Sequence, residues 1–433
     1  MSQPILTRLT RRRHRPPLTS LLLLTTPSPT KTNTKLILQA YFSSSTFRLT
    51  FDPDSYLAQA RQTFAARQPT HIIPDTLSPT NSYLLTLSLA DQIPSLFPWY
   101  HHQPSSSPIH YPGTTTTQKE GENAQEEDED PLTLPQGHHL VYFPLQLPPS
   151  KLMPDGTDPA HCPGPPFTRR LWAGGSVVFK PGWREVLRMD GRRVCCVENV
   201  DVESVKYAEG KGDGDGGKVF VDVRRRYGLP GLKGGAEDGE GTAAVVEEVR
   251  RLVFLREERE ERGEMGVGRV LKARHPPDYT HRLLPTATLL FHFSALTYNA
   301  HQIHLNPLYA RECEGYKDLL VHGPLTLVLM ISALRAALVK LGLTGSYKEE
   351  GIATTTAGPG MKRGTPYVVS LTYRNLAPLY VDEQLTVCLR RRRGVASSSG
   401  TAGDEKEGLV GWDVWIEGPL GGMAVKGEAV TTG

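Results

Sequence analysis

The chain has 433 residues, enough for two or three domains, and its formal charge is +3 at neutral pH. Hydrophobic residues make up 38% of it, and 41 glycines and 35 prolines dilute the apolar segments. That composition is typical of a globular core with long loops. The five cysteines include the adjacent pair Cys195 and Cys196 but no C-x-x-C spacing, which argues against structural zinc and favours a reducing compartment.

Residues 1–42 are predicted to be a mitochondrial transit peptide that directs the protein to the matrix. No Asp or Glu occurs before Asp52, and the segment is rich in Arg, Ser and Thr, with three consecutive arginines at 11–13. A disordered basic tail has the same composition. Seven Lys and Arg residues precede Tyr41, so the formal charge without them changes from +3 to −4. A nucleic-acid-binding surface is therefore not predicted.

Four low-complexity segments in the rest of the chain are predicted to be surface loops. They are rich in Gly or in acidic and small polar residues, so they contain too little apolar surface to order themselves. None of them has the glycine spacing and strand-to-helix setting of a dinucleotide-binding motif, and the sequence has no P-loop. The segments are residues 112–131, 208–218, 231–241 and 395–408.

Between these loops the sequence predicts helical and strand segments in two blocks. Residues 80–97 are a candidate helix, which Thr80 or Asn81 would cap. Segments rich in β-branched and aromatic residues then predict several strands up to residue 257. The same residue pattern predicts further strands after residue 365.

The segment 323–342 is predicted to be a buried helix. Pro324 suits a first helical turn and Gly342 a C-terminal stop, and no charged residue occurs from Pro324 to Leu334. The segment is too short for a membrane span, and no other run of about 18 apolar residues occurs. An apolar helix followed by strands predicts an antiparallel sheet wrapped around a helix, and two such copies would fill the chain.

The sequence LTYNAHQIHLNP, residues 296–307, places two imidazoles and an amide in an apolar setting. Asn299 is followed by His301 and His304, and the predicted buried helix begins shortly afterwards at Gly323. A histidine in apolar sequence is, taken alone, more often a hydrogen-bonded core residue than a catalyst. The spacing of the three polar residues gives them a second interpretation.

This segment resembles the motif of the HotDog-fold, MaoC-like (3R)-hydroxyacyl-thioester dehydratases and enoyl hydratases. The form of the motif in this chain is most similar to that of the type 2 mitochondrial dehydratases and the related mesaconyl-CoA hydratases. Residues 167–179 and 374–387 also resemble that subfamily. The chain departs from the general motif in having Asn299 at the place of an Asp, His301 at that of an Asn and Gln302 at that of a Pro.

The resemblance implies an α+β fold with two HotDog halves, each an antiparallel sheet wrapped around a buried central helix. We expect the N-terminal half to span 43–265 and to be non-catalytic, because it contains no N-x-H-x-I-H sequence. The C-terminal half, 270–433, carries the motif. HotDog domains work in pairs, so the chain is expected to be a monomeric pseudo-dimer or a homodimer.

The resemblance also implies the site residues. An imidazole has a pKa near working pH and can act as base and then as acid, which makes His304 the candidate catalyst. Asn299 would hold the substrate hydroxyl or the water, and the N–H of Gly323 would stabilise the enolate. His301 is either a second catalytic residue or a residue that fixes the loop.

The remaining expectations concern the substrate. Arg169 and Arg170 either line a solvated edge or contact the phosphates of the carrier. The expected reaction is the dehydration of a 3-hydroxyacyl thioester, on acyl carrier protein or coenzyme A, in type II fatty acid synthesis, with no metal or other cofactor. One alternative is a hydratase of short branched acyl-CoA such as mesaconyl-CoA. Another is a catalytically inactive HotDog subunit that binds the acyl carrier.

Overall fold

The computed structural model describes residues 51–67, 71–97, 132–210, 217–231, 243–256, 271–341, 366–392 and 408–432. The predicted transit peptide, and most of each predicted low-complexity loop, lie outside these described residues. All the helices and strands named below belong to one unit, Asp52–Gly433.

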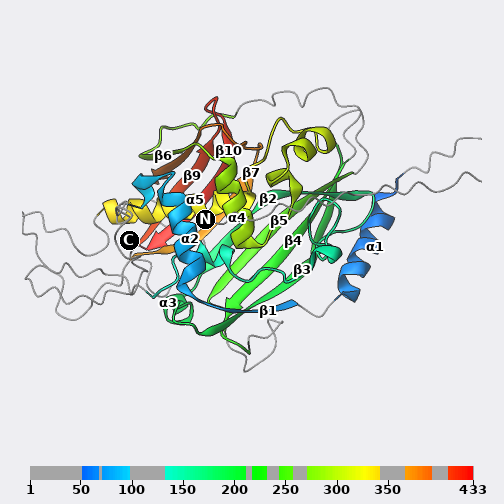
Figure 1. The fold of residues 1–433 in the computed structure, drawn as a ribbon, viewed down its shortest axis with the longest axis horizontal. Helices are drawn as coiled ribbons and strands as arrows, with labels where there is room; N and C mark the ends of the chain where they lie inside the picture. The colour runs from blue at the N-terminus through cyan, green and yellow to red at the C-terminus, as the bar shows by residue number, and fades with distance from the viewer. Residues whose placement is uncertain are drawn as a thin grey trace, which may run out of the picture. The chain divides into compact units, whose positions relative to one another are not determined.

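Ten antiparallel strands form one sheet, in the order β1-β3-β4-β5-β2-β7-β10-β9-β8-β6 (Figure 1). The strands are β1 (His71–Thr76), β2 (Phe167–Phe179), β3 (Arg193–Ala208), β4 (Lys218–Gly228), β5 (Val246–Arg256), β6 (Tyr279–Leu283), β7 (Val368–Asn375), β8 (Leu385–Arg391), β9 (Leu409–Glu417) and β10 (Met423–Thr432). We call the parts of the chain that carry β1–β5 and β6–β10 the N-terminal and C-terminal halves.

The two halves repeat one strand pattern. From the outer edge inward, each half has its first, third, fourth, fifth and second strand in that order. The second strands, β2 and β7, then pair antiparallel from Gly174↔Arg374 to Val178↔Ser370 and join the halves into a continuous sheet. The expected α+β class and the antiparallel HotDog sheet are thereby confirmed, whereas the boundaries 43–265 and 270–433 stay a prediction.

The helix α5 (Gly323–Lys340) is the buried helix that the sequence predicts, and it lies against strands β7, β8 and β9 (Figure 1). Thirteen of its residues are buried, because its first eleven residues carry no charge. The helix ends two residues before the expected stop, Gly342, which lies outside the described residues. Contrary to the expectation that this segment is too short for a membrane span, α5 is, among the described helices, the one long and apolar enough to cross a bilayer, but most of it is buried inside the protein, as in a core helix.

The helices of the N-terminal half are short. The predicted helix 80–97 is α2 (Pro79–Ala90), which packs on α4 (Ala287–Thr297) (Figure 1). It ends earlier than expected because Pro94 has no N–H and would clash with the carbonyl of Ala90. The other helical segments here are α1 (Pro53–Ala66), which packs on β3, and α3 (Trp183–Val186), with 3-10 turns at Pro94–Leu96 and Pro149–Lys151.

A buried central helix is expected in each half, and among the described residues of the N-terminal half no helix is as long as α5. Between α2 and β2 the structure has the 3-10 turn η2 (His138–Val141), which contacts both α2 and α5. Pro144, Pro148 and Pro149 follow closely, and each one lacks the N–H that a continuing helix requires. Within the described residues, α5 is therefore the long central helix of the whole sheet.

Replacing a side chain of α5 by alanine is expected to destabilise the protein more, the more deeply that side chain is buried. Leu327 is 0% exposed, so Leu327→Ala should lower the free energy of unfolding by about 2–5 kcal/mol. Val339, at 38% exposure on the same helix, is the control, and Val339→Ala should change it by less than about 1 kcal/mol. Urea unfolding followed by circular dichroism measures both values, and equal effects would contradict the burial of α5.

Candidate functional site

The segment between α4 and α5 holds the two motif histidines and a third, His322. The hydroxyl of Thr286 caps α4 by accepting the N–H of Leu289, and the helix ends at Tyr298, whose φ of 52° is left-handed. The chain then turns through the 3-10 helix Gln302–His304 and the π-helical turn Tyr309–Cys313 before α5 begins. His301, His304 and His322 are all buried.

The hydrogen bonds of His304 define its tautomer. Its Nδ1 donates to the carbonyl of Leu320 over 2.8 Å, which leaves Nε2 as the unprotonated acceptor of a neutral ring. The ring stacks on His322, with centroids 3.7 Å apart and planes 20° apart. His322 is fixed in turn by a 2.8 Å hydrogen bond between its Nε2 and the Ser294 hydroxyl. His304 is therefore held rigidly from two sides.

Asn299 and His301 are linked through the backbone. The Oδ1 of Asn299 accepts the N–H of His301 over 3.0 Å, so the amide oxygen shapes the loop. Its Nδ2 makes no hydrogen bond to any residue that the structure describes, and Asn299 lines the cavity. The His301 ring stands edge-on to His304 at 5.5 Å between centroids, and its Nε2 lies 3.6 Å from Asp155 Oδ2.

Burial keeps all three imidazoles neutral. It lowers the pKa of His304 to about 4, against the opposing effect of the hydrogen bond to Leu320. Burial and the neighbouring His304 lower the pKa of His301 and of His322 well below the ordinary value. At neutral pH the site therefore contains unprotonated rings, the form a general base requires.

Gly323 brings the positive end of α5 to the same place. As the first residue of the helix its N–H has no intrahelical partner, and the helix dipole favours negative charge there. A Cβ at this position would lie 2.4 Å from Trp172 Cγ, so only glycine lets the helix end approach β2 this closely. A backbone donor beside two imidazoles suits a developing oxyanion.

These groups line one cavity of about 550 Å³. Asn299, His301, His304 and Gly323 contribute from the C-terminal half. The N-terminal half contributes apolar side chains such as Leu145 and several charged ones. The cavity is large enough for a small acyl group with part of its carrier arm.

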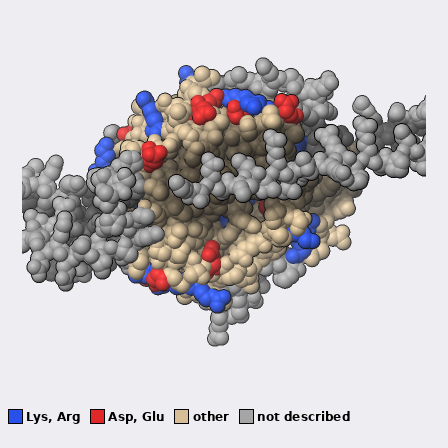
Figure 2. Space-filling model, viewed as in Figure 1, with Lys and Arg blue, Asp and Glu red and all other residues tan. Residues whose placement is uncertain are grey.

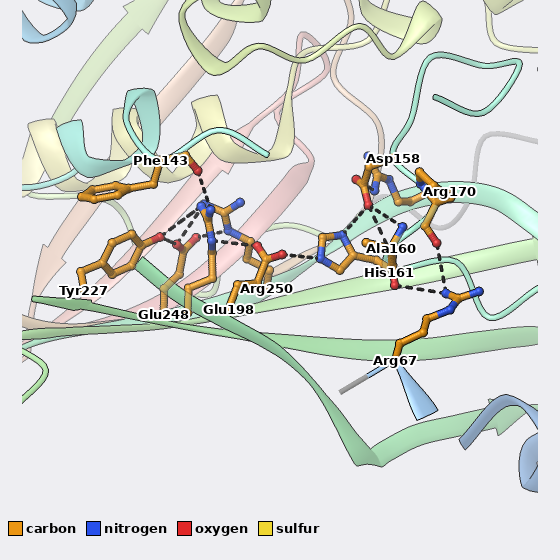
Figure 3. A network of polar contacts seen from close by, with 12 residues as sticks. Arg67, Phe143, Asp158, Ala160, His161, Arg170, Glu198, Tyr227, Glu248 and Arg250 are labelled. Atoms are coloured by element: carbon orange, nitrogen blue, oxygen red, sulfur yellow. Dashed lines mark hydrogen bonds and ion pairs between the residues drawn. The ribbon is translucent and has the colours of Figure 1, made fainter. Parts of the chain in front are cut away.

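The charged side chains of the N-terminal half form a buried network (Figure 3). His161 lies between two carboxylates, with Nδ1 3.0 Å from Asp158 and Nε2 2.9 Å from Glu198. Burial opposes its charge, but the two carboxylates outweigh burial and raise the pKa of His161 to about 9. Glu198 also pairs with Arg225 at 2.9 Å, and Arg250 pairs with Glu248 at 2.8 Å. His161 is thus a fixed cation with no free nitrogen.

The two candidate phosphate-binding arginines are already ion-paired. Arg169 makes hydrogen bonds of 2.9 and 2.6 Å to the Glu314 carboxylate, which ties β2 to the segment before α5. Arg170 pairs with Asp158 at 2.5 Å and lines the cavity. The structure therefore brings Arg170, but not Arg169, to the cavity with His301 and His304. Their contact with carrier phosphates stays a prediction.

Sequence reasoning did not find the groups that the N-terminal half contributes. Asp155, His161 and Glu198 lie 98 or more residues before the segment 296–307, and no local spacing marks them. His322, which lies outside the motif, is the stacking partner of His304. Among the described residues, no three His, Cys, Asp or Glu side chains are arranged to hold a metal ion.

The buried histidines predict a stability maximum near pH 6.5. The folded pKa of His304, about 4, lies below the unfolded value of about 6.5, so its contribution is complete above pH 6.5 and is lost toward pH 4. His161 has a folded pKa of about 9, so its contribution is complete below pH 6.5 and is lost toward pH 9. Melting temperatures between pH 4 and 10 measure both slopes.

Two variants and one control test which histidine causes each slope of melting temperature against pH. His161→Gln should flatten the alkaline side and His304→Gln should reduce the acid side, while the exposed His275→Gln should change neither. An alkaline slope that survives in His161→Gln would show that the ion network does not hold this histidine charged.

Residues 137–351 match the sequence profile of the family described as "Hydroxyacyl-thioester dehydratase type 2". The mitochondrial hydroxyacyl-thioester dehydratase type 2 of Schizosaccharomyces pombe is 25% identical over 271 residues, which cover 59% of this chain and 78% of that protein. Mesaconyl-C(4)-CoA hydratase of Chloroflexus aurantiacus is 31% identical over 209 residues, 47% of this chain and 64% of its own length.

A solved structure is also similar to this chain. The MaoC-like dehydratase of Phytophthora capsici has 16% sequence identity and a TM-score of 0.44, with 86% of this chain and 98% of that one covered. The names of the curated relatives are those of a dehydratase and a hydratase, in agreement with the expected class of enzyme, a hydro-lyase. Through its residues 137–351, which include the three histidines and all of α5, the chain resembles the hydroxyacyl-thioester dehydratases of type 2.

Proposed function

We propose that this protein is a hydro-lyase that interconverts a (3R)-3-hydroxyacyl thioester with the trans-2-enoyl thioester and water. The observation that carries the proposal is His304, a buried neutral imidazole with an unprotonated Nε2 in the cavity that Gly323 also lines. The family resemblance over residues 137–351 supports it independently.

In the proposed mechanism His304 Nε2 removes the proton from Cα, and the N–H of Gly323 stabilises the negative charge that develops on the thioester oxygen. The resulting imidazolium then transfers the proton to the hydroxyl on Cβ. The C–O bond breaks, water leaves, and the double bond forms between Cα and Cβ. His304 is returned to its neutral state, so no external acid is consumed.

Asn299 is proposed to position the substrate hydroxyl rather than to transfer a proton. Its Oδ1 is engaged with the backbone of His301, but its Nδ2 is available to donate to the hydroxyl oxygen. An amide keeps one donor and one acceptor at every accessible pH. This division explains how the site works with an amide at residue 299.

The acyl group and its carrier are also proposals. We propose a carrier-protein or CoA thioester, as the family resemblance supports, and Arg170 is the candidate contact for the carrier. Most of the cavity lining is apolar, but Asp158, His161, Glu198 and Arg225 give one part of it a charged wall. That observation favours, as a second candidate, a hydratase of short acyl-CoA with a polar end, the type that mesaconyl-CoA represents.

The rival from another class is a catalytically inactive subunit that binds acyl carrier. Its surface would need to meet an acidic carrier protein. On the face in Figure 2, the Lys and Arg side chains are interspersed with Asp and Glu toward the edges, and the area between is largely uncharged. That face shows no broad cationic patch among its described residues, but the proposed enzyme could also take a carrier-bound substrate, so turnover and not surface charge distinguishes the two.

Substitution of His304 tests the mechanism. His304→Ala should lower kcat by roughly 10²–10⁴-fold, the usual contribution of a general acid–base. Asn299→Ala should lower it less, because Asn299 transfers no proton. Enoyl-CoA hydration by the purified proteins, followed by absorbance, measures both, and circular dichroism checks the fold. Near-normal turnover in a folded His304→Ala protein would refute the assignment of the base.

We further propose that the protein works in the mitochondrial matrix, in type II fatty acid synthesis. The acid-free sequence of residues 1–42 supports this, as does the mitochondrial location in the name of the S. pombe relative. A fluorescent protein fused behind residues 1–50 should enter mitochondria, and the same fusion with Arg11, Arg12 and Arg13 changed to Glu should not. A uniform cytosolic signal from the unmodified fusion would contradict the location.

A further inference from the structure

The loop that carries the motif contains no acidic residue. From Tyr298 to His304 the chain supplies two side-chain amides, two imidazoles and no carboxylate. The carboxylates that line the cavity, Asp158 and Glu198, are both bound to cations of the N-terminal half. An acidic partner for the imidazoles must therefore come from elsewhere.

Asp155 of the N-terminal half meets this requirement. Its Oδ2 lies 3.6 Å from His301 Nε2. In the part of the chain that the structure describes, no other carboxylate lies within 4 Å of a nitrogen of His301, His304 or His322. A distance of 3.6 Å is longer than a hydrogen bond, and catalytic contacts of this kind tighten when substrate closes the site.

The turn that carries Asp155 is built against the motif loop. The carbonyls of Pro154 and Asp155 accept the side-chain and backbone N–H groups of Gln302, each over 2.8 Å. Gly156 adopts a φ of +85°, and a Cβ there would lie 2.0 Å from the carbonyl oxygen of Ala300. The two halves thus approach so closely here that the position of the carboxylate is fixed.

Hydrogen bonds within the turn hold the Asp155 carboxylate in one orientation. Oδ1 accepts the backbone N–H of Thr157 over 2.9 Å and the Thr157 hydroxyl over 2.7 Å, which directs Oδ2 toward His301. The side chain is only 14% exposed, and no Lys or Arg among the described residues lies within 4 Å of it. Among the described residues, His301 is therefore the one titratable partner within 4 Å of this carboxylate.

We propose that Asp155 is a positioning residue that fixes the tautomer and orientation of His301 from the opposite half of the molecule. With its proton on Nε2, directed at Asp155, His301 presents Nδ1 as an acceptor. Nδ1 then accepts the hydrogen of the substrate hydroxyl, while His304 delivers the proton that turns this hydroxyl into water. The inference rests on the proposed function, and it gives the N-terminal half a direct part in the site.

The variant Asp155→Asn removes the negative charge of the side chain while it keeps the hydrogen bond that holds the turn. An asparagine keeps the Oδ1 that accepts from Thr157, so the fold should be retained, but its NH₂ group would face His301 Nε2 and favour the opposite tautomer. We expect kcat to fall roughly 10- to 100-fold with little change in KM. Asp190→Asn is the matched control, because Asp190 makes the same kind of hydrogen bond, to the N–H of Arg192 at 3.1 Å, away from the cavity.

A double-mutant cycle tests whether Asp155 acts through His301. The variant that combines Asp155→Asn with His301→Gln should be no slower than His301→Gln alone. Fully multiplicative effects, or a wild-type kcat in Asp155→Asn, would overturn the inference. An equal loss of activity in Asp190→Asn would also overturn it, because any Asp→Asn change in a turn would then have the same effect.

A second readout does not depend on turnover. The ¹⁵N chemical shifts of His301 should report the proton on Nε2 in the wild-type protein and on Nδ1 in Asp155→Asn. The same tautomer in both proteins would overturn the inference, even if the wild-type protein were active. A wild-type protein that hydrates no enoyl-CoA would instead count against the proposed function, while the tautomer would still decide the role of Asp155.

Discussion

The burial of α5 is the constraint on which the site depends. A helix without a charged residue in its first eleven positions is stable only where apolar side chains cover it on all sides, and strands β7, β8 and β9 provide that cover. Its burial fixes the position of Gly323, and therefore of the positive helix end. His322 precedes Gly323 directly, and its stacked ring holds His304. The core and the candidate site are thus one structure.

The described part of the N-terminal half contacts the motif loop through a turn and polar groups, not through a long helix. Where the C-terminal half has α5, the described chain between α2 and β2 has a proline-rich segment and the turn Met153–Thr157. This turn supports the motif loop through Gln302 and Gly156, and the ion network around His161 lies on the sheet beside it (Figure 3). The N-terminal half therefore supplies one wall of the cavity that the motif loop also lines.

Much of the architecture could be predicted from the sequence, because local patterns determine it. The apolar run after Gly323 indicated α5, and the spacing of Asn299, His301 and His304 indicated the loop that lines the cavity. The early end of α2 follows from Pro94, and within the described residues the prolines after η2 prevent a long helix there. Asp155 could not be predicted, since its place beside His301 arises only when the two halves pack.

The central claim is that the C-terminal half performs stereospecific removal of water from a thioester. The most direct measurement is the conversion of (3R)-3-hydroxyacyl-CoA by the purified full chain, followed by the absorbance of the enoyl thioester, with the (3S) epimer as the matched substrate. The account predicts turnover of the (3R) epimer and not of the (3S) epimer. Binding of the acyl thioester without turnover of either epimer would contradict it, and would identify the protein as a carrier-binding subunit.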